Sequence, residues 1–324
     1  MRVLITGGAG FIGSHLADHW LAHGAGVTVV DNLSTGRRLN LEHQTGVPRF
    51  RFIEGDVLDR TLMSELIEQH DLICHLAAVV GVKRVLSDPL TAIQQNVGGT
   101  EVVLALAQQY HRRVVFASTS EVYGKNPHVP FAEDDPSVLG STRTTRWCYA
   151  VSKILDEHLC LAYHHRGLPV SIVRYFNAYG PRLDPRGYGS VIAMFVTQAL
   201  ARQPLTVHGQ GRQTRCFTYV QDTVQGTALA AQRPEALGQA FNIGHSGEIS
   251  ILELAKLVQR LTRSDAGIIL TPYEHVYGAG FEDTERRVPN IGKARDLLGF
   301  CAEVTLEQGL QRTIAWFSEN QATA

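Results

Sequence analysis

Residues 1–13 read MRVLITGGAGFIG, and this stretch decides the fold. Its apolar part, 3–6, predicts a short strand that runs straight into a glycine turn. Gly7, Gly10 and Gly13 follow with the spacing G-x-x-G-x-x-G and open a helix. These glycines allow a sharp pivot, a close approach of the backbone to a pyrophosphate, and tight packing of the helix on the strand. The stretch therefore predicts a dinucleotide whose phosphates lie at the positive end of the helix.

A second apolar strand, 26–30, ends at Asp31. An acidic residue at this distance from a glycine turn binds the ribose 2′-hydroxyl of a dinucleotide. Because a carboxylate there repels the 2′-phosphate of NADP, the predicted cofactor is NAD. Arg37 and Arg38 lie near enough in the sequence to accommodate that phosphate, but we interpret them as solvated loop charges.

The bulk composition is that of an ordinary globular protein, with 324 residues, 44% of them hydrophobic and 19% charged. The net charge of −1 gives no electrostatic signal for nucleic acid or for an anionic membrane. The five cysteines are an odd number without a Cys-x-x-Cys pair, which fits a reducing compartment and predicts no metal site. With no bilayer-length apolar run and a core strand at the N-terminus, we expect a cytoplasmic protein without a signal peptide.

Strands and helices alternate along the first half of the chain. Further strands are predicted within 51–57, 71–78, 112–119 and 169–175, and helices at 91–109 and 148–165. Strands separated by helices imply right-handed crossovers and a parallel sheet. The sequence therefore predicts an α/β protein with a doubly wound Rossmann sheet, which binds its ligands at the carboxyl ends of the strands.

The composition changes at 180–189, which reads GPRLDPRGYG and which we interpret as facing the substrate. Beyond it, helical patterns at 191–202 and 251–261 mix with short extended pieces, without a linker. These features predict a smaller, mixed α/β domain that is interleaved with the first. The predicted boundaries assign 1–176 and about 217–243 to the NAD-binding domain, and about 177–216 and 244–324 to the substrate domain.

Tyr149 and Lys153 lie four residues apart in YAVSK and so share one face of a predicted helix. A lysine ammonium one turn away lowers the pKa of a phenol and also reaches a cofactor ribose. The phenolate then removes a hydroxyl proton while a hydride leaves the same carbon for nicotinamide. Tyr149 and Lys153 indicate this chemistry only in combination with the glycine turn and with a Ser/Thr-rich strand end upstream.

That strand end, 117–124, reads ASTSEVYG. Thr119 or Ser120 can donate a hydrogen bond to the reacting oxygen. Glu121 adds a second acid or base, or an electrostatic partner, that a plain alcohol oxidation does not require. The structural alternative for Glu121 is a capping or ion-pairing role.

With these residues in place, the chain resembles, from end to end, an extended short-chain dehydrogenase/reductase acting on nucleotide sugars. Within that superfamily it resembles the UDP-glucuronic acid decarboxylases, namely the UDP-xylose synthases and the bacterial oxidative decarboxylase of the 4-amino-arabinose lipid pathway. The resemblance is carried by ASTSEVYG, 146–153 (RWCYAVSK), 174–177 (RYFN), 180–184 (GPRLD), 213–217 (QTRCF), 276–283 (VYGAGFED) and 286–289 (RRVP).

The resemblance implies the roles of individual residues. The implied catalytic set is Thr119, Ser120, Glu121, Tyr149 and Lys153. The implied cofactor contacts are Gly7, Gly10, Phe11, Ile12, Gly13, Asp31, Asn32, Asp56, Val57, Leu76, Ala77, Ala78, Asn96, Tyr149 and Lys153. The implied substrate contacts are Asn177, Arg182, Arg215 and Arg287, with Arg287 near the sugar carboxylate and Asn177 and Arg215 near the nucleotide and its phosphates. As a structural alternative, Arg215 and Arg287 pair with acids such as Glu285.

The implied reaction oxidises C4 of a UDP-sugar, which turns the C5 carboxylate into that of a β-keto acid and releases carbon dioxide. Either NADH then reduces the ketone, or the keto-pentose and NADH leave. A UDP-sugar 4-epimerase or a nucleotide-hexose 4,6-dehydratase begins with the same oxidation, and RYFNAYGP, with Tyr175, is equally typical of 4-epimerases. Glu121 argues against simple epimerases more than against dehydratases, and a non-catalytic NAD-sensing protein would not need Tyr149, Lys153 and Ser120 together.

A homodimer through 91–109 and 148–165 is expected.

Overall fold

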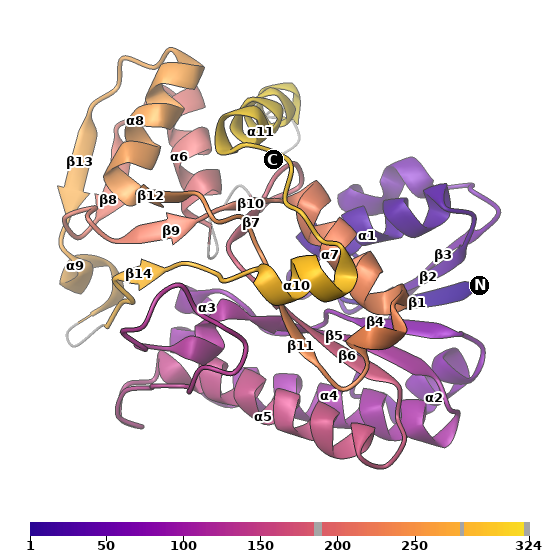
Figure 1. Ribbon diagram of the computed structural model, residues 1–324. Helices are drawn as coiled ribbons and strands as arrows, with labels where there is room; N and C mark the ends of the chain where they lie inside the picture. Colours follow the sequence, from indigo (N-terminus) through magenta and orange to yellow (C-terminus); the bar gives the residue numbers. More distant parts are fainter. Residues whose placement is uncertain (185–189, 279–281, 321–324) are drawn as a thin grey trace.

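The computed structural model describes residues 1–184, 190–278 and 282–320. Within these residues, a seven-stranded parallel sheet forms the centre, in the order β11-β6-β5-β4-β1-β2-β3 (Figure 1). Its strands are β1 (Arg2–Thr6), β2 (Gly26–Asp31), β3 (Phe50–Glu54), β4 (Leu72–His75), β5 (Arg113–Thr119), β6 (Val170–Tyr175) and β11 (Ala240–Ile243). The strand order reverses between β1 and β4, which is the switch point where such sheets bind ligands. The predicted doubly wound α/β fold is confirmed.

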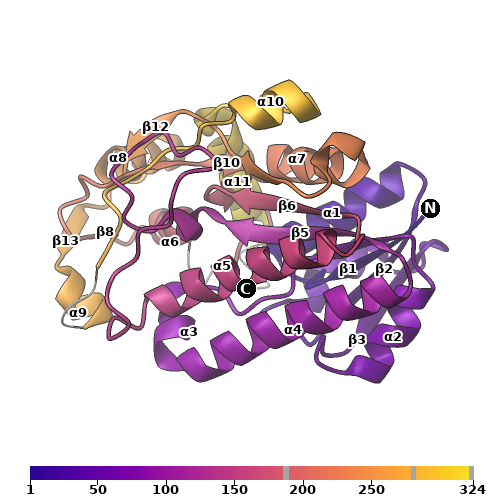
Figure 2. The ribbon, with the colours of Figure 1, turned by 60° about the horizontal axis from the view of Figure 1, so that its bottom comes forward.

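Helices cover both faces of this sheet. On one face lie α1 (Phe11–Ala22) and α7 (Val220–Gln232), which contact each other. On the other face α4 (Pro89–Gln109) and α5 (Trp147–His164) run side by side, with α2 (Arg60–Glu68) beside α4 (Figures 1 and 2). This two-sided cover is the layering that right-handed crossovers produce.

The three central residues of β1 explain why its sequence shows no alternation of polar and apolar side chains. Val3 and Ile5 belong to the apolar cluster on the α1 side, whereas Leu4 belongs to the cluster on the α4 side. All three side chains are completely buried. A strand that is covered on both faces needs apolar residues at every position, so no alternation appears in the sequence.

The helix α4 begins two residues before the predicted 91, at Pro89. The carboxylate of Asp88 caps this end by accepting a hydrogen bond from the Thr91 amide at 3.0 Å. Proline suits the first helical position because its missing N–H has no intrahelical partner there. The cap, rather than the apolar periodicity, therefore sets the start.

The remaining elements include a smaller lobe beside the carboxyl ends of the strands (Figure 1). Its three-stranded sheet, β12-β9-β14, pairs Arg287 with Arg215 across neighbouring strands. The elements not yet given are η1 (Arg38–Gln44), α3 (Val82–Ser87), η2 (Ser120–Tyr123), β7 (Ala178–Tyr179), α6 (Val191–Leu200), β8 (Leu205–His208), β9 (Thr214–Cys216), β10 (Thr218–Tyr219), η3 (Pro234–Ala236), β12 (Glu248–Ser250), α8 (Ile251–Thr262), β13 (Ile268–Thr271), α9 (Tyr273–Tyr277), β14 (Arg286–Arg287), α10 (Gly292–Leu298) and α11 (Leu306–Asn320).

The chain enters the smaller lobe after β6, returns to the central sheet for α7 and β11, and then leaves it again. We still propose two domains. One consists of 1–176 with about 217–243, and the other of about 177–216 with 244–324. Residues 185–189 of the predicted substrate-facing stretch and 279–281 of VYGAGFED lie outside the described residues. None of the described helices combines the length and the apolar character that a bilayer span needs.

Candidate active site

The glycine turn between β1 and α1 lines one part of a cavity of about 670 Å³. Gly7 has a φ of +68°, and a Cβ there would lie 2.8 Å from the Ala77 backbone. A Cβ on Gly13 would lie 2.6 Å from the Cα atom of Gly8. Gly10 is the N-cap of α1 and offers no side-chain acceptor to the amides of the first turn. The turn thus has the close backbone approach and the available amides that fit a dinucleotide pyrophosphate.

Gly13→Ala is expected to lower the free energy of unfolding by about 1–3 kcal/mol and to weaken NAD binding. The added Cβ meets backbone atoms, which cannot rotate aside. Thermal denaturation with and without NAD measures both effects. Gly267→Ala is the matched control, because a Cβ at Gly267 meets nothing within 4 Å. Equal stability of the two variants would contradict the tight packing of the turn.

Asp31 ends β2, lines the cavity and is 8% exposed. Its carboxylate accepts hydrogen bonds from the amides of Leu33 at 2.8 Å and Ala9 at 2.9 Å, which tie it to the glycine turn. Burial raises the pKa of Asp31, and these two hydrogen bonds oppose the rise. Since each carboxylate oxygen has a second lone pair, both remain able to accept from a ribose hydroxyl.

The two arginines after Asp31 lie in different surroundings. Arg38 forms an exposed ion pair with Glu54 at 2.7 Å, as expected of a loop charge. Arg37 is half-buried and lines the cavity, and its interpretation as a solvated loop charge stays a prediction. The amide of Arg37 donates to the Ala9 carbonyl at 3.0 Å, which draws this loop toward the glycine turn.

Most of the predicted cofactor contacts line the cavity. They are Gly7, Gly10, Phe11, Ile12, Gly13, Asp31, Asn32, Val57, Leu76, Ala77, Ala78, Tyr149 and Lys153. Asp56 and Asn96 are not among the residues that line it. Asp56 accepts from the Asn32 side chain at 2.8 Å, and Asn96, which is 1% exposed, accepts from the Val79 amide at 2.7 Å. Each of them thus contacts a residue of the cavity wall.

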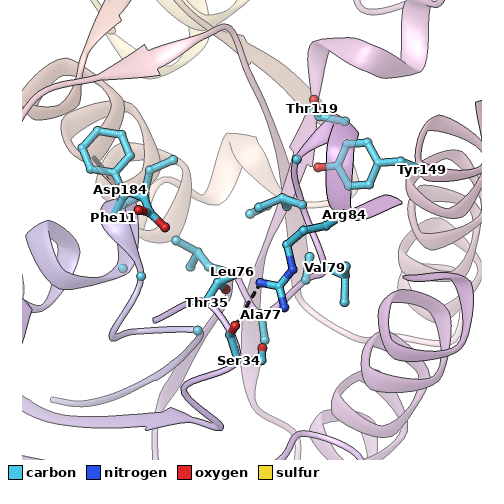
Figure 3. Close-up of a pocket in the computed structure, with 18 of the residues that line it drawn as sticks. Phe11, Ser34, Thr35, Leu76, Ala77, Val79, Arg84, Thr119, Tyr149 and Asp184 are labelled. Carbon is cyan, nitrogen blue, oxygen red and sulfur yellow. Dashed lines mark hydrogen bonds between the residues drawn. The ribbon is translucent and has the colours of Figure 1, made fainter. Parts of the chain in front are cut away.

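Tyr149, Thr119, Ser120 and Glu121 line the same cavity, although they come from α5, β5 and η2. Figure 3 shows the Tyr149 ring projecting from α5 toward the cavity, with Thr119 nearby. Burial raises the pKa of Tyr149, the charge of Glu121 raises it further, and a hydrogen bond with Thr119 opposes the rise. The structure therefore brings together the hydroxyl groups of the predicted catalytic set.

Lys153 also lines the cavity and contacts two groups of the surrounding structure. Its ammonium group donates to the Ala117 carbonyl at 3.1 Å and lies 3.6 Å from a carboxylate oxygen of Asp156. Lys153 is 3% exposed, and burial lowers its own pKa. The expectation that Lys153 lowers the pKa of Tyr149 therefore stays a prediction.

Beside the hydroxyl groups lies a charged cluster, which we call the arginine cluster: Glu121, Arg146, Arg215, Asp283 and Arg287. Arg287 and Arg146 contact Glu121 at 2.7 and 3.1 Å. Arg215 and Arg146 contact Asp283 at 2.9 and 3.5 Å. With three guanidinium groups and two carboxylates, the described cluster has a net charge of +1. It is thus a built site with an excess of positive charge.

Glu121 is ionised within the arginine cluster. Burial by itself raises its pKa, but the attraction of Arg287, followed by that of Arg146, outweighs burial and lowers the pKa to about 2. The structural alternative of an ion-pairing glutamate therefore describes its contacts, and Arg287 pairs with Glu121 rather than with Glu285. At neutral pH, Glu121 is a fixed negative charge and not a proton donor.

The other predicted substrate contacts divide into two groups. Asn177 and Arg182 line the cavity. Asn177 donates to the Cys216 carbonyl at 2.9 Å, and Arg182 forms an ion pair with Asp18 at 2.7 Å. Arg215 does not line the cavity, but it stands behind Arg287 in the arginine cluster and is 8% exposed.

Sequence reasoning missed several residues of the site. Arg146 was quoted within RWCYAVSK but given no role, although it precedes Tyr149 by three residues and so falls on the same side of the helix. Asp283 completes the arginine cluster and accepts from the Tyr273 hydroxyl at 2.9 Å. Arg84, from α3, lines the cavity and donates to the Ser34 carbonyl at 2.9 Å (Figure 3).

Comparison with known proteins identifies the family of the chain. Residues 3–244 match the NAD dependent epimerase/dehydratase family. The chain is 46% identical to a UDP-N-acetyl-alpha-D-glucosaminuronate decarboxylase of Bacillus cytotoxicus over 98% of both chains. It is 39% identical to UDP-glucuronic acid decarboxylase 2 of Arabidopsis thaliana over 98% of this chain and 68% of the relative.

A solved structure of UDP-glucuronic acid 4-epimerase from Bacillus cereus, in complex with UDP-glucuronic acid and NAD, superposes with a TM-score of 0.87. The two chains are 30% identical, and the match covers 98% of this chain and 99% of the other. The predicted NAD cofactor, the enzyme class and the resemblance to an extended short-chain dehydrogenase/reductase are confirmed by these matches. The chain belongs to the NAD-dependent epimerase/dehydratase family.

Proposed function

We propose that the protein decarboxylates a UDP-linked hexuronate after transient oxidation at C4 of the sugar. The observation that carries this proposal is the arginine cluster beside Tyr149, with its net charge of +1. A buried positive site suits a carboxylate on the substrate, whereas a neutral hexose has no group to occupy it. Relatives at 46% and 39% identity, whose names specify uronate decarboxylases, support the same reaction.

The residues of the cavity have separate roles in this reaction. NAD, bound along the glycine turn and Asp31, supplies the acceptor for a hydride from C4. Tyr149 acts as a phenolate, which the charge of the Lys153 ammonium one turn away favours, and receives the proton of the C4 hydroxyl, while Thr119 and Ser120 donate hydrogen bonds to the reacting oxygen. Lys153 and Asp31 would hold the ribose hydroxyls of the bound cofactor.

The arginine cluster acts on the other side of the sugar ring. Arg287 binds and orients the C5 carboxylate, and Glu121 holds Arg287 in position through their ion pair at 2.7 Å. Once C4 is a ketone, the C5–carboxylate bond breaks and its electron pair moves into an enolate at O4. Carbon dioxide leaves because the hydrogen-bond donors at O4 stabilise that enolate.

Two uronates are candidate substrates. UDP-glucuronate is the substrate that the sequence resemblance implies, and its 2-acetamido counterpart is favoured by the name of the 46% identical relative. The two differ only at C2, which takes no part in the chemistry at C4 and C5. We therefore propose the same mechanism for both.

Mass spectrometry of the products tests the proposal. The protein is incubated with NAD⁺ and, separately, with UDP-glucuronate, its 2-acetamido counterpart, UDP-glucose and UDP-N-acetylglucosamine. Loss of carbon dioxide from a uronate is the expected result. An isomer of unchanged mass would instead identify a 4-epimerase, and loss of water from a hexose a 4,6-dehydratase. The absorbance of accumulated NADH shows whether the ketone is reduced before release.

We further propose a homodimer through α4 and α5. Leu90 and Ile93 on α4 are 63% and 42% exposed, and Val151 and Leu155 on α5 are 49% and 45% exposed. Large apolar side chains gathered on two adjacent helices are typical of a protein interface. A second copy of the chain, presenting the same two helices, would cover them.

The double variant Val151→Asp/Leu155→Asp is expected to be a monomer, because two carboxylates would be buried at the interface. Light scattering during size-exclusion chromatography measures the mass. Ile269→Asp/Leu270→Asp is the control, since these β13 side chains are similarly exposed, at 52% and 46%, and should leave the dimer intact. A dimer that survives the α5 substitutions would place the interface elsewhere.

A further inference from the structure

Lys153 and Asp156 form a buried ion pair on the inner side of α5. The side chains are 4% and 0% exposed, and the nearest ammonium and carboxylate atoms are 3.6 Å apart. This distance is too long for a charge-assisted hydrogen bond, so the interaction is mainly Coulombic. Burial raises the pKa of Asp156 to about 6, although the Lys153 charge opposes the rise, so the carboxylate is ionised at neutral pH but not in acid.

The groups around the pair leave Asp156 to act chiefly on Lys153. Glu157, the neighbouring carboxylate on α5, is engaged by Arg174 at 2.7 Å and by the Ser118 hydroxyl at 2.5 Å. Cys160, on the same helix, stays a neutral thiol because burial raises its pKa well above the usual value.

Two further groups near the pair, on β4 and α4, add no competing charge at neutral pH. His75 on β4 bonds to Thr6 at 2.7 Å and to Thr100 at 3.3 Å. Burial, together with Lys153, lowers the pKa of His75 to about 3, so the ring is neutral. Thr100 on α4 is uncharged and lies near the Asp156 carboxylate, whose two oxygens have no hydrogen-bond partner among the described residues.

We propose that Asp156 is a positioning residue that holds the Lys153 ammonium at the Ala117 carbonyl and whose buried charge acts on Lys153 and Tyr149 together. The inference rests on the proposed role of Tyr149 as the proton acceptor. A nearby negative charge favours the protonated form of both a phenol and an amine. Asp156 accordingly raises the pKa of Tyr149 and opposes the lowering of the Lys153 pKa by burial.

The consequence is a specific change in pH dependence. The reaction needs a Tyr149 phenol that can lose its proton and a Lys153 amine that keeps one. A plot of kcat against pH should therefore fall off on an acidic side and on an alkaline side, and we call these two slopes the limbs. Asp156→Asn removes the charge and keeps the shape, and both limbs are expected to move to lower pH by about one unit. Asp156→Glu keeps the charge and should leave the limbs in place. KM should change little, because Asp156 does not line the cavity.

Controls separate this effect from a loss of stability. Ser171→Ala removes a fully buried hydroxyl on β6 that donates to the Ala230 carbonyl at 2.9 Å, and it should lower the melting temperature without moving either limb. If Asp156→Asn behaves like Ser171→Ala, the role of Asp156 is structural and the inference fails. Asp156→Ser, a second neutral variant, replaces Asp156→Asn if the latter does not fold.

A measurement without turnover distinguishes this inference from the proposed function. Competitive acetylation of Lys153 in the full-length protein, read by mass spectrometry across pH, gives the pH at which the amine becomes reactive. This midpoint should fall in Asp156→Asn and stay in Asp156→Glu. An unchanged midpoint in Asp156→Asn overturns the inference. A lowered midpoint in a protein that decarboxylates neither uronate supports it while overturning the proposed function.

Discussion

Replacing Tyr149 with phenylalanine is expected to lower kcat by about 100- to 10,000-fold and to leave NAD binding unchanged. The substitution removes the oxygen that receives the C4 hydroxyl proton and keeps the ring that lines the cavity. Carbon dioxide release and NADH absorbance measure the loss, and equilibrium binding of NAD⁺ checks the cofactor site.

Tyr175→Phe is the matched control for that experiment. Tyr175 also lines the cavity, but its hydroxyl forms a hydrogen bond with the Thr227 hydroxyl at 2.8 Å. Its removal should change kcat by less than about 10-fold, since only a local hydrogen bond is lost. Native turnover by Tyr149→Phe would show that another group accepts the proton.

Glu121→Gln is expected to remove most carbon dioxide release, by on the order of 100-fold, while NAD binding is retained. The neutral amide cannot hold Arg287 and Arg146 as the carboxylate does, at 2.7 and 3.1 Å. A displaced Arg287 would misalign the substrate carboxylate. Turnover of a UDP-uronate at the native rate would show that Glu121 has no role in catalysis.

The same variant should change how stability depends on pH. The pKa of Glu121 is about 2 in the folded protein, against an ordinary value of 4.5. A lowered pKa in the folded state stabilises the fold above the ordinary pKa, and this stabilisation is lost as pH falls through the folded value. Glu121 thus contributes roughly 3 kcal/mol at neutral pH.

Urea unfolding at neutral and acidic pH measures this contribution. The free energy of unfolding of Glu121→Gln should vary less between pH 7 and pH 3 than that of the native protein, by an amount on the order of 1 kcal/mol or more. Glu65→Gln, at an exposed position on α2, is the control. Identical pH dependence in all three proteins would mean that the arginine cluster does not stabilise the fold through Glu121.

Much of the fold and part of the site follow from local sequence because strand ends meet at one edge of a parallel sheet. Gly7, Asp31 and Thr119 each stand where an apolar strand stops, and the structure places all three on one cavity. Tyr149 joins them because its helix leads into the next strand of the same sheet. These predictions needed only periodicity and crossover rules.

The arginine cluster could not be predicted in this way. Arg146 and Asp283 lie 137 residues apart in the sequence, and they meet only because the smaller lobe packs beside the strand ends. No local sequence pattern predicts the contact between these two residues. Lys153 shows a second difficulty: Tyr149 and Asp156 are both one turn away on the same helix, and burial against Ala117, not spacing, determines which of them the ammonium contacts.

The position of β11 in the chain also bears on how the protein is made. This strand pairs with β6, yet it is synthesised only after α6, β8 and β9. A nascent chain that has emerged as far as residue 176 therefore presents β6 with an open edge, which is a template for wrong pairing. The seven-stranded sheet is complete only once residue 243 has left the ribosome, so this sheet cannot be exchanged between relatives as a cassette with a single junction.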